Sequence, residues 1–229
     1  MQAFPTCPYC NKRFLLDIVR MQPTPIPAEE IELFKQLTDL KVIFDVGART
    51  DTDYLTLWPD SQHHLFEPHP KFFDELYAKV KDIPNVTANN FGLGDKNERR
   101  CYYEPLQSFV GNGNAPNGTT DMVFEIKTLG KYVTEKEITH IDYLKIDTEG
   151  HDLYVLIGAY NWRDTIRFIQ YEHWGEVNNK MIHGLLQDEF EMYDVGYRNV
   201  FCMNKKLVSD EERTRLRTYI EEHKLSELV

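Results

Sequence analysis

Acidic residues that directly follow short apolar runs are the side chains of this chain best placed for chemistry. Val42-Ile43-Phe44 leads into Asp45-Val46-Gly47-Ala48, and Leu65-Phe66 leads into Glu67-Pro68. A glycine lets the backbone turn tightly beside a ligand, and a carboxylate about 20 residues further on can accept hydrogen bonds from both hydroxyls of a ribose. The two motifs therefore predict a site for the adenosine half of a cofactor.

Other apolar runs end in polar residues in the same way. Asn90 closes the run 85–91, Asp147 and Glu149 follow the run 141–146, and Glu172 and His173 follow the run 166–171. Ligands of open α/β sheets bind beyond the carboxyl ends of the strands. We therefore expect one edge of a sheet to gather these residues: Asp45, Gly47, Glu67, Asn90, Asp147, Glu149, Glu172 and His173.

The elements that position this edge alternate between strands and helices. Strands are predicted at 42–46, 63–67, 85–91, 141–147 and 166–171, and helices between them, including one that begins at Pro70. Such alternation predicts an α/β fold with a doubly wound, mostly parallel sheet. Residues 185–193 are predicted to be helical. Residues 199–203 and 207–208 are predicted to form an antiparallel pair, before a terminal helix capped by Ser209.

The ends and loops of the chain suggest one domain with an extension. Pro23, Pro25 and Pro27 forbid a helix, so residues 1–28 are predicted to be an N-terminal arm and 29–229 the domain. Cys7 and Cys10 have the spacing of half a zinc site or of a redox pair, beside the simpler interpretation as part of the arm. The polar stretch 104–120 is either a functional loop or a disordered insertion.

Composition narrows the classes of partner. The chain has 229 residues, 41% hydrophobic and 28% charged, which is ordinary for a globular domain, and a net charge of -11. That charge repels a polyphosphate, so a nucleic-acid partner is not expected. No apolar run approaches the roughly 18 residues of a membrane span, and no secretory signal is visible. We expect a cytoplasmic protein without a membrane anchor.

Several motifs in order resemble the FkbM-type methyltransferase family. They are Phe44-Asp45-Val46-Gly47-Ala48, Phe66-Glu67-Pro68-His69-Pro70, Phe91-Gly92-Leu93-Gly94-Asp95, Leu144-Lys145-Ile146-Asp147-Thr148-Glu149-Gly150-His151-Asp152 and Val155-Leu156-Ile157-Gly158-Ala159. The resemblance runs from about Val42 to Lys206. It implies a class I methyltransferase sheet of seven strands with an antiparallel C-terminal hairpin, S-adenosylmethionine as cofactor, and O-methylation of a hydroxyl, often on a sugar. One departure is Arg49-Thr50-Asp51, where the family usually has Asn and a further glycine.

The resemblance and the strand-end pattern together assign a cofactor side. Gly47 allows the turn, Glu67 accepts from the ribose, and Arg49 contacts the methionine carboxylate of the cofactor. Asn90 and Phe91 lie beside adenine, although a core role is nearly as good an interpretation for Phe91. The predicted cofactor residues are Asp45, Gly47, Ala48, Arg49, Glu67, Pro68, Asn90, Phe91 and Asp147.

Methyl transfer to a weakly acidic hydroxyl needs a base or a metal, and the sequence leaves several candidates. The candidate catalytic residues are Asp147, His173, Glu149, Glu172 and Lys145. Of these, Asp147, Glu149 and Glu172 are also candidate ligands of Mg²⁺ or another divalent cation. For Lys145, inside an apolar strand, an ion pair with Glu149 or Glu172 is the favoured interpretation. Trp174 and His151 are predicted to contact the acceptor, with capping an equal alternative for His151.

The sequence therefore predicts an S-adenosylmethionine-dependent O-methyltransferase that acts on a sugar or glycan hydroxyl. A non-catalytic cofactor- or glycan-binding domain of the same fold is the alternative. A nicotinamide-dependent oxidoreductase is disfavoured, because the segment from Gly47 to Thr52 lacks the Gly-x-Gly-x-x-Gly pattern. The acceptor and the oligomeric state stay open.

Overall fold

A computed structural model describes residues 28–103, 108–109, 122–173, 175–196, 198–223 and 226–227. The predicted arm apart from Ala28, both of its cysteines, Trp174 and most of the polar stretch 104–120 lie outside the described residues. Among the described helices, none has the length and apolar character needed to cross a membrane.

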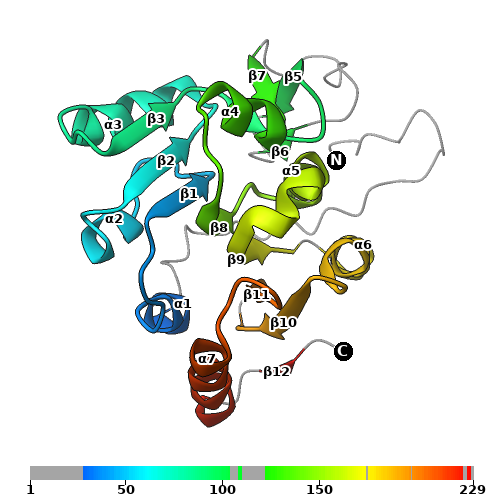
Figure 1. The fold of residues 1–229 in the computed structure, drawn as a ribbon. Coiled ribbons are helices and arrows are strands. Elements are labelled where there is room, and N and C mark those ends of the chain that lie inside the picture. Colours follow the sequence, from blue (N-terminus) through cyan, green and yellow to red (C-terminus); the bar gives the residue numbers. More distant parts are fainter. Residues whose placement is uncertain are drawn as a thin grey trace, which may run out of the picture.

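The main sheet has eight strands among the described residues, in the order β12-β10-β11-β9-β8-β1-β2-β3 (Figure 1). Strands β3, β2, β1, β8 and β9 are parallel, and β11 runs antiparallel to both β9 and β10. The predicted seven-stranded, mostly parallel sheet is thus confirmed, and β12 adds a short edge. The bounds are β1 Val42–Val46, β2 Gln62–Phe66, β3 Val86–Asn89, β8 Ile141–Ile146, β9 Ile166–Glu172, β10 Phe190–Asp194, β11 Asn199–Asn204 and β12 Ser226–Glu227.

The antiparallel hairpin does not use the segments predicted for it. Residues 190–194 form β10 rather than a helix, and they pair with β11. Phe190 and Met192 enter one core while Tyr193 enters the other, so this strand is buried on both faces and carries no clear period. The predicted strand 207–208 is instead part of a turn, because the side chain of Asn204 accepts the N–H groups of Lys206 and Leu207.

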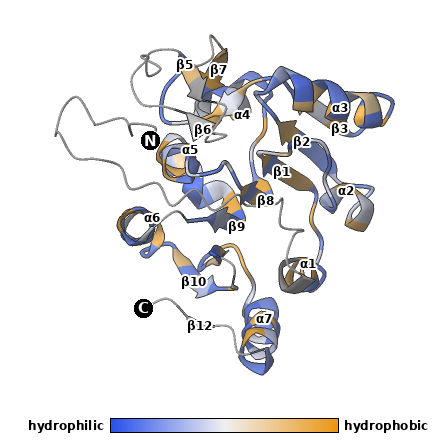
Figure 2. Ribbon diagram, turned by 180° about the vertical axis from the view of Figure 1, so that it is seen from behind, coloured by the Kyte–Doolittle hydropathy of each residue, from blue (hydrophilic) through white to orange (hydrophobic). Residues whose placement is uncertain are grey.

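Helices cover both faces of the sheet, as the alternation along β1 requires. Phe44 and Val46 pack with α4, α5 and α6, whereas Ile43 packs with α1, α2 and α7, and α3 lies against β2 and β3. Figure 2 shows β1 and β2 largely in the orange of apolar residues, whereas α3 carries both blue and orange residues. The helices are α1 Ala28–Phe34, α2 Tyr54–Leu57, α3 Pro70–Val80, α4 Leu129–Glu135, α5 Asp152–Ala159, α6 Glu176–Leu186 and α7 Asp210–Glu222, with a 3₁₀ helix at Tyr160–Thr165.

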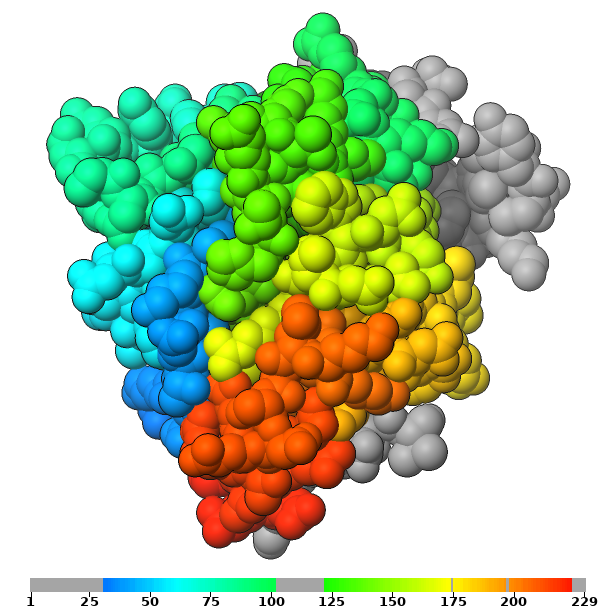
Figure 3. Space-filling model, in the orientation of Figure 1, coloured from blue at the N-terminus to red at the C-terminus, as the bar shows by residue number. Residues whose placement is uncertain are grey.

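The cap predicted for the terminal helix is confirmed, and it does more than begin α7. Ser209 Oγ accepts the N–H of Glu212. The buried Glu212 carboxylate then accepts from the Thr38 hydroxyl, 2.9 Å away, and pairs with Arg167 of β9. These bonds hold α7 against α1 and the sheet, at the opposite end of the molecule from α4 (Figures 1 and 3).

A small second sheet is inserted between β3 and α4. Its order is β4-β7-β5-β6, and its strands are β4 Gly92–Leu93, β5 Glu98–Tyr103, β6 Ser108–Phe109 and β7 Val123–Lys127. Two glycines let it approach α5: a Cβ on Gly158 would lie 2.0 Å from the carbonyl oxygen of Gly94. Arg100 also bonds Asp95 and His151, so the small sheet is fixed beside the first turn of α5.

The contact between Gly158 and Gly94 gives a stability prediction with an internal control. Gly158→Ala should destabilise the fold by about 1–3 kcal/mol, because the new methyl group overlaps backbone that has no room to move. Gly184→Ala, in α6 with nothing within 4 Å, should instead stabilise it by about 0.5–1 kcal/mol. Urea unfolding of both variants checks this, and equal effects would contradict the packing described.

Candidate functional site

The carboxyl ends of four strands stop at one level of the sheet. Val46 pairs with Phe66 on one side and with Ile146 on the other, and Ile146 pairs with Tyr171. The residues that follow these pairs are the predicted ones: Gly47, Glu67, Asp147 and Glu172. The structure therefore brings together, in one row, side chains that are more than a hundred residues apart in the sequence.

Gly47 lies where the carboxyl ends of β1 and β8 meet. Its φ is +90°, and a Cβ there would lie only 1.9 Å from the carbonyl oxygen of Asp147. Its N–H donates to the Phe66 carbonyl at 3.0 Å, as does that of Ala48 at 3.2 Å, while the Asp147 N–H donates to Val46 O at 2.9 Å. Backbone bonds thus join the ends of β1, β2 and β8 into one surface.

Glu67 is the carboxylate that closes this surface over β2. It is 6% exposed, and its two oxygens accept the backbone N–H groups of Arg49, at 3.0 Å, and His69, at 2.7 Å. Burial raises the pKa of Glu67 to about 7, although the two N–H donors oppose that rise. Each carboxylate oxygen has a second lone pair, so Glu67 can accept two further hydroxyl donors.

Arg49 occupies the position where the sequence departs from the family that it resembles. Its φ is +52°, a left-handed conformation that Asn adopts more easily than Arg, and the bond from its N–H to Glu67 holds it there. The guanidinium lies 5.0 Å from the centre of the Phe72 ring. Asp51 pairs with Lys79 of α3 at 2.8 Å, so its charge is directed toward that helix.

The two residues predicted beside adenine differ in their contacts. Asn90 donates through Nδ2 to the carbonyls of Glu67, at 3.0 Å, and Pro68, at 3.3 Å, and so fixes the exit of β2. The Phe91 ring packs edge-on against Phe66, with centroids 5.7 Å apart, in the core under α4. Phe91 thus takes the core role that the sequence left open.

Lys145 forms an ion pair, but with partners other than those predicted. Its Nζ lies 3.7 Å from Asp45 Oδ1 and 3.4 Å from Asp147 Oδ2, where Glu149 or Glu172 was expected. Neighbouring strands place Asp45 and Lys145 in register on the same face, which explains the pairing. Burial raises the pKa of Asp45, and the ammonium opposes that rise.

The loop after β8 depends on a residue that sequence reasoning missed. Glu149 and Gly150 both have positive φ, 54° and 94°. The buried Asp152 carboxylate accepts the Thr148 hydroxyl at 3.0 Å and the Gly150 N–H at 3.3 Å. Burial raises the pKa of Asp152 well above its usual range, and burial also raises the pKa of Glu149. In the sequence, Asp152 stands two residues after Gly150. An acidic residue this close to a turn glycine is the signal that could have identified it.

The structure gives no support to the predicted metal site. Within the ranges that the structure describes, no group of three or more His, Cys, Asp or Glu side chains could hold a metal ion. Glu172 is instead paired with Arg198 at 2.9 Å, and Asp147 with Lys145. These cations occupy two of the three predicted ligands, Asp147 and Glu172, so the described side chains fit internal ion pairs better than a divalent ion.

The two predicted histidines lie in different surroundings. The half-buried His173 donates its backbone N–H to the carbonyl of Arg198 at 2.9 Å. The Nδ1 atom of its ring is buried without a partner among the described residues. Burial lowers its pKa. His151 is 3% exposed, lies 3.1 Å from Arg100 and stacks on Tyr154, and burial lowers its pKa to about 3. The contacts of His151 join α5 to the small sheet, so its ring is not open to an acceptor.

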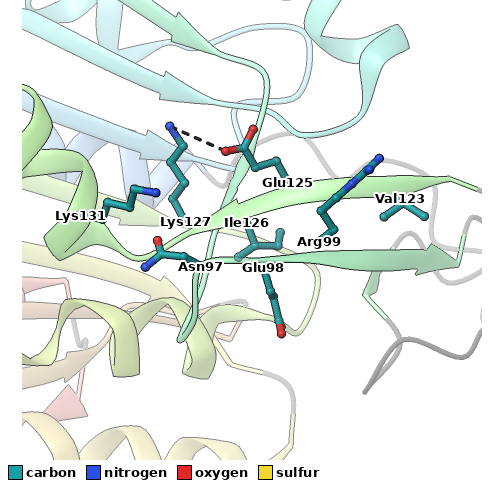
Figure 4. A pocket seen from close by; sticks show the side chains of 8 residues that line it. All are labelled: Asn97, Glu98, Arg99, Val123, Glu125, Ile126, Lys127 and Lys131. Carbon is teal, nitrogen blue, oxygen red and sulfur yellow. Dashed lines mark ion pairs between the residues drawn. The ribbon is translucent and has the colours of Figure 1, made fainter.

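An open pocket of about 630 Å³ lies away from this row, on the small sheet. Figure 4 shows Lys127 and Glu125 extending from β7 as an ion pair, with Arg99 and Lys131 nearby. The residues that line the pocket are Asn97, Glu98, Arg99, Val123, Glu125, Ile126, Lys127 and Lys131. The charges of this lining are mixed, and none of the residues at the carboxyl ends of β1, β2, β8 and β9 belongs to it, so the row stays the candidate site.

Comparisons with known proteins match this fold. A family model described as the methyltransferase FkbM domain matches residues 45–198. The hexuronic acid methyltransferase AglP of Haloferax volcanii is 28% identical over 163 residues, which are 68% of this chain and 65% of that protein. The crystal structure of methyltransferase FkbM from Methylobacillus flagellatus has a TM-score of 0.50 at 12% identity, covering 71% of this chain and 43% of that one. The chain thus spans less than two thirds of either protein.

The contact at Gly47 can be tested apart from its backbone conformation. Gly47→Ala and Gly196→Ala both place an alanine at positive φ, which should destabilise each variant by about 1–2 kcal/mol. Only Gly47→Ala adds a clash with Asp147 O, worth about 1–3 kcal/mol more, since nothing lies within 4 Å of Gly196. Denaturant midpoints measure the difference, and equal losses would contradict the close approach of β1 and β8.

Proposed function

The chain belongs to the FkbM methyltransferase domain family, and we propose that it transfers the methyl group of S-adenosylmethionine to a hydroxyl of a sugar or glycan. The observation that carries this proposal is the pairing of Glu67 with the turn at Gly47, at adjacent strand ends. The name of the Haloferax volcanii relative, a hexuronic acid methyltransferase, supports a sugar as the acceptor. The buried Cys202 is a free thiol, which supports the cytoplasm as the compartment.

The residues at the row fit the cofactor from its nucleoside end. In this proposal Glu67 accepts hydrogen bonds from the ribose hydroxyls, and Asn90 and Pro68 border the adenine. The backbone of Gly47 and Ala48 lies beneath the cofactor. Arg49 binds the methionine carboxylate, because Glu67 and Phe72 hold it beside the turn. The bound cofactor supplies an activated methyl group on a sulfonium. The cationic sulfonium suits an edge that carries Asp45, Asp147 and Glu149.

The protein must then align a hydroxyl and remove its proton. The acceptor oxygen approaches over β8 and β9, where Asp147 and His173 are the candidate bases. Asp147 is held by Lys145, and the lowered pKa of His173, caused by its burial, keeps the ring neutral and able to accept a proton at pH 7. Glu149 and Glu172 border the same space as supporting carboxylates.

The role of Glu67 gives a pH dependence for cofactor binding. A carboxylate accepts ribose hydroxyls more strongly when it is ionised, and the pKa of Glu67 in the free protein is about 7. S-adenosylmethionine should therefore bind about tenfold more weakly at pH 6 than at pH 8, with proton release at the lower pH. Calorimetry measures both quantities.

Matched ligands and a variant isolate that effect. Adenosine, which keeps the ribose and lacks the methionine, should show the same pH trend. Glu67→Gln should bind the cofactor weakly and almost independently of pH, with a thermal melt to verify that it is folded. If the wild type binds the cofactor with equal affinity at both pH values, the proposed hydrogen bonds between Glu67 and the ribose are contradicted.

The base assignment predicts a separation of binding from turnover. His173→Ala or Asp147→Asn should lower methyl transfer by about 10²–10⁴-fold while cofactor affinity stays near the wild-type value. A panel of mono- and oligosaccharides, with mass detection of the added methyl, measures turnover. If both variants keep full turnover, neither residue is the base; cofactor binding by the wild type without turnover on any acceptor would favour a binding domain.

A further inference from the structure

We propose that the acceptor carries a carboxylate, as a uronic acid does, and that Arg198 binds this group. The inference rests on the proposed function and names the substrate class of the same site. Arg198 lies between β10 and β11, in a turn that the strand-end pattern did not point to. Its position, its charge and its fixed geometry support the inference.

The position of the acceptor follows from the order of the strands. If Glu67 holds the ribose over β2, the cofactor extends over Gly47 and β1 toward β8. The acceptor then lies further along, over β8, β9 and β11. Asn199 pairs with Glu172 across β11 and β9, so Arg198 immediately precedes the row at its acceptor end. Three strand spacings, about 14 Å, separate it from β1.

The charges at this end favour a cation beside an anionic acceptor. Asp147 and Glu172 stand at the ends of β8 and β9, and their carboxylates would repel that of the acceptor if no cation lay beside them. Burial raises the pKa of Glu149, and Arg198 is among the cations that oppose this rise. Burial lowers the pKa of His173, and Arg198 adds to this effect. Its guanidinium thus acts on the space in which the hydroxyl would react.

The structure holds Arg198 in a defined orientation. Its φ is +67°, a strained conformation for an arginine, and its carbonyl accepts the His173 N–H. Its Nη2 lies 2.9 Å from Glu172 Oε1, where the Glu172 side chain is 13% exposed and that of Arg198 is 36% exposed. One buried carboxylate therefore orients the fork while part of the side chain reaches solvent. A planar guanidinium matches a carboxylate with two parallel hydrogen bonds.

The other cations near the edge are less suited. Lys145 is buried between Asp45 and Asp147, and Arg49 lies at the cofactor end. Lys131 and the other cations of the small-sheet pocket lie away from the row, and Lys131 is 3.8 Å from Glu135. The hexuronic acid in the name of the Haloferax volcanii relative agrees with an acidic acceptor.

A pair of acceptors that differ in one group tests the inference. The probes are p-nitrophenyl β-D-glucuronide and p-nitrophenyl β-D-glucoside, with S-adenosylmethionine as donor. The wild type should prefer the glucuronide. Arg198→Gln should lower kcat/KM for the glucuronide by about 10–100-fold more than for the glucoside, mainly through KM. Arg198→Lys, which keeps the charge and loses the fork, should fall between them.

Two control variants separate recognition from packing. Arg163→Gln breaks a similar pair, 2.9 Å from Glu189 with both partners largely buried, in the 3₁₀ helix before β9. It should keep the preference for the glucuronide. Lys131→Gln removes a cation of the small-sheet pocket and should also keep it. Thermal melts and cofactor affinity are measured for all variants.

The outcomes distinguish this inference from the proposed function. A wild type without preference between the probes overturns the inference, as does an equal loss on both probes in Arg198→Gln. Loss of the preference in Lys131→Gln alone would move recognition to the small sheet and also overturn it. Cofactor binding with no binding of either probe overturns the inference and leaves the proposed function standing. Failure to bind the cofactor defeats the proposed function itself.

Discussion

The contact between the Gly47 turn and the carbonyl of Asp147 is the constraint on which the rest of the structure depends. It lets β1 and β8 leave the sheet side by side without a side chain between them. The bonds from Gly47 and Ala48 to Phe66 then draw in the end of β2, and Glu67 closes over the turn through Arg49. A larger residue at position 47 would separate the strand ends from one another. The functional row is therefore a consequence of backbone packing before it is one of side-chain chemistry.

Electrostatics at this edge follows from partial neutralisation. The chain carries a net charge of -11, and its strand ends are rich in carboxylates. Lys145 is placed between Asp45 and Asp147, and Arg198 beside Glu172, so two of the carboxylates at the row are already compensated. The negative charge that these cations leave uncompensated suits a cationic cofactor at one end of the row. The carboxylates that suggested metal ligation in the sequence form internal ion pairs instead.

The sequence predicted the strand ends because each lies at the end of an apolar run, where a change to polar residues is unambiguous. It failed where information is not local. β10 is buried on both faces and shows no period, so the sequence wrongly predicts a helix there. The partners of Lys145 depend on the register between β1 and β8. Arg198 reaches the site through the pairing of β11 with β9, which its neighbours in the sequence do not indicate.

The joint between the small sheet and α5 has a consequence for how the molecule responds to acidity. It is formed by Arg100 and by His151, whose pKa burial lowers to about 3. The imidazole hence stays neutral from mildly acidic to alkaline solution, and no proton loosens its contact with the guanidinium. Glu67, by contrast, gains or loses its proton near neutrality. Acidification would thus protonate the carboxylate at the end of β2, on a frame whose attachment to the inserted sheet does not change.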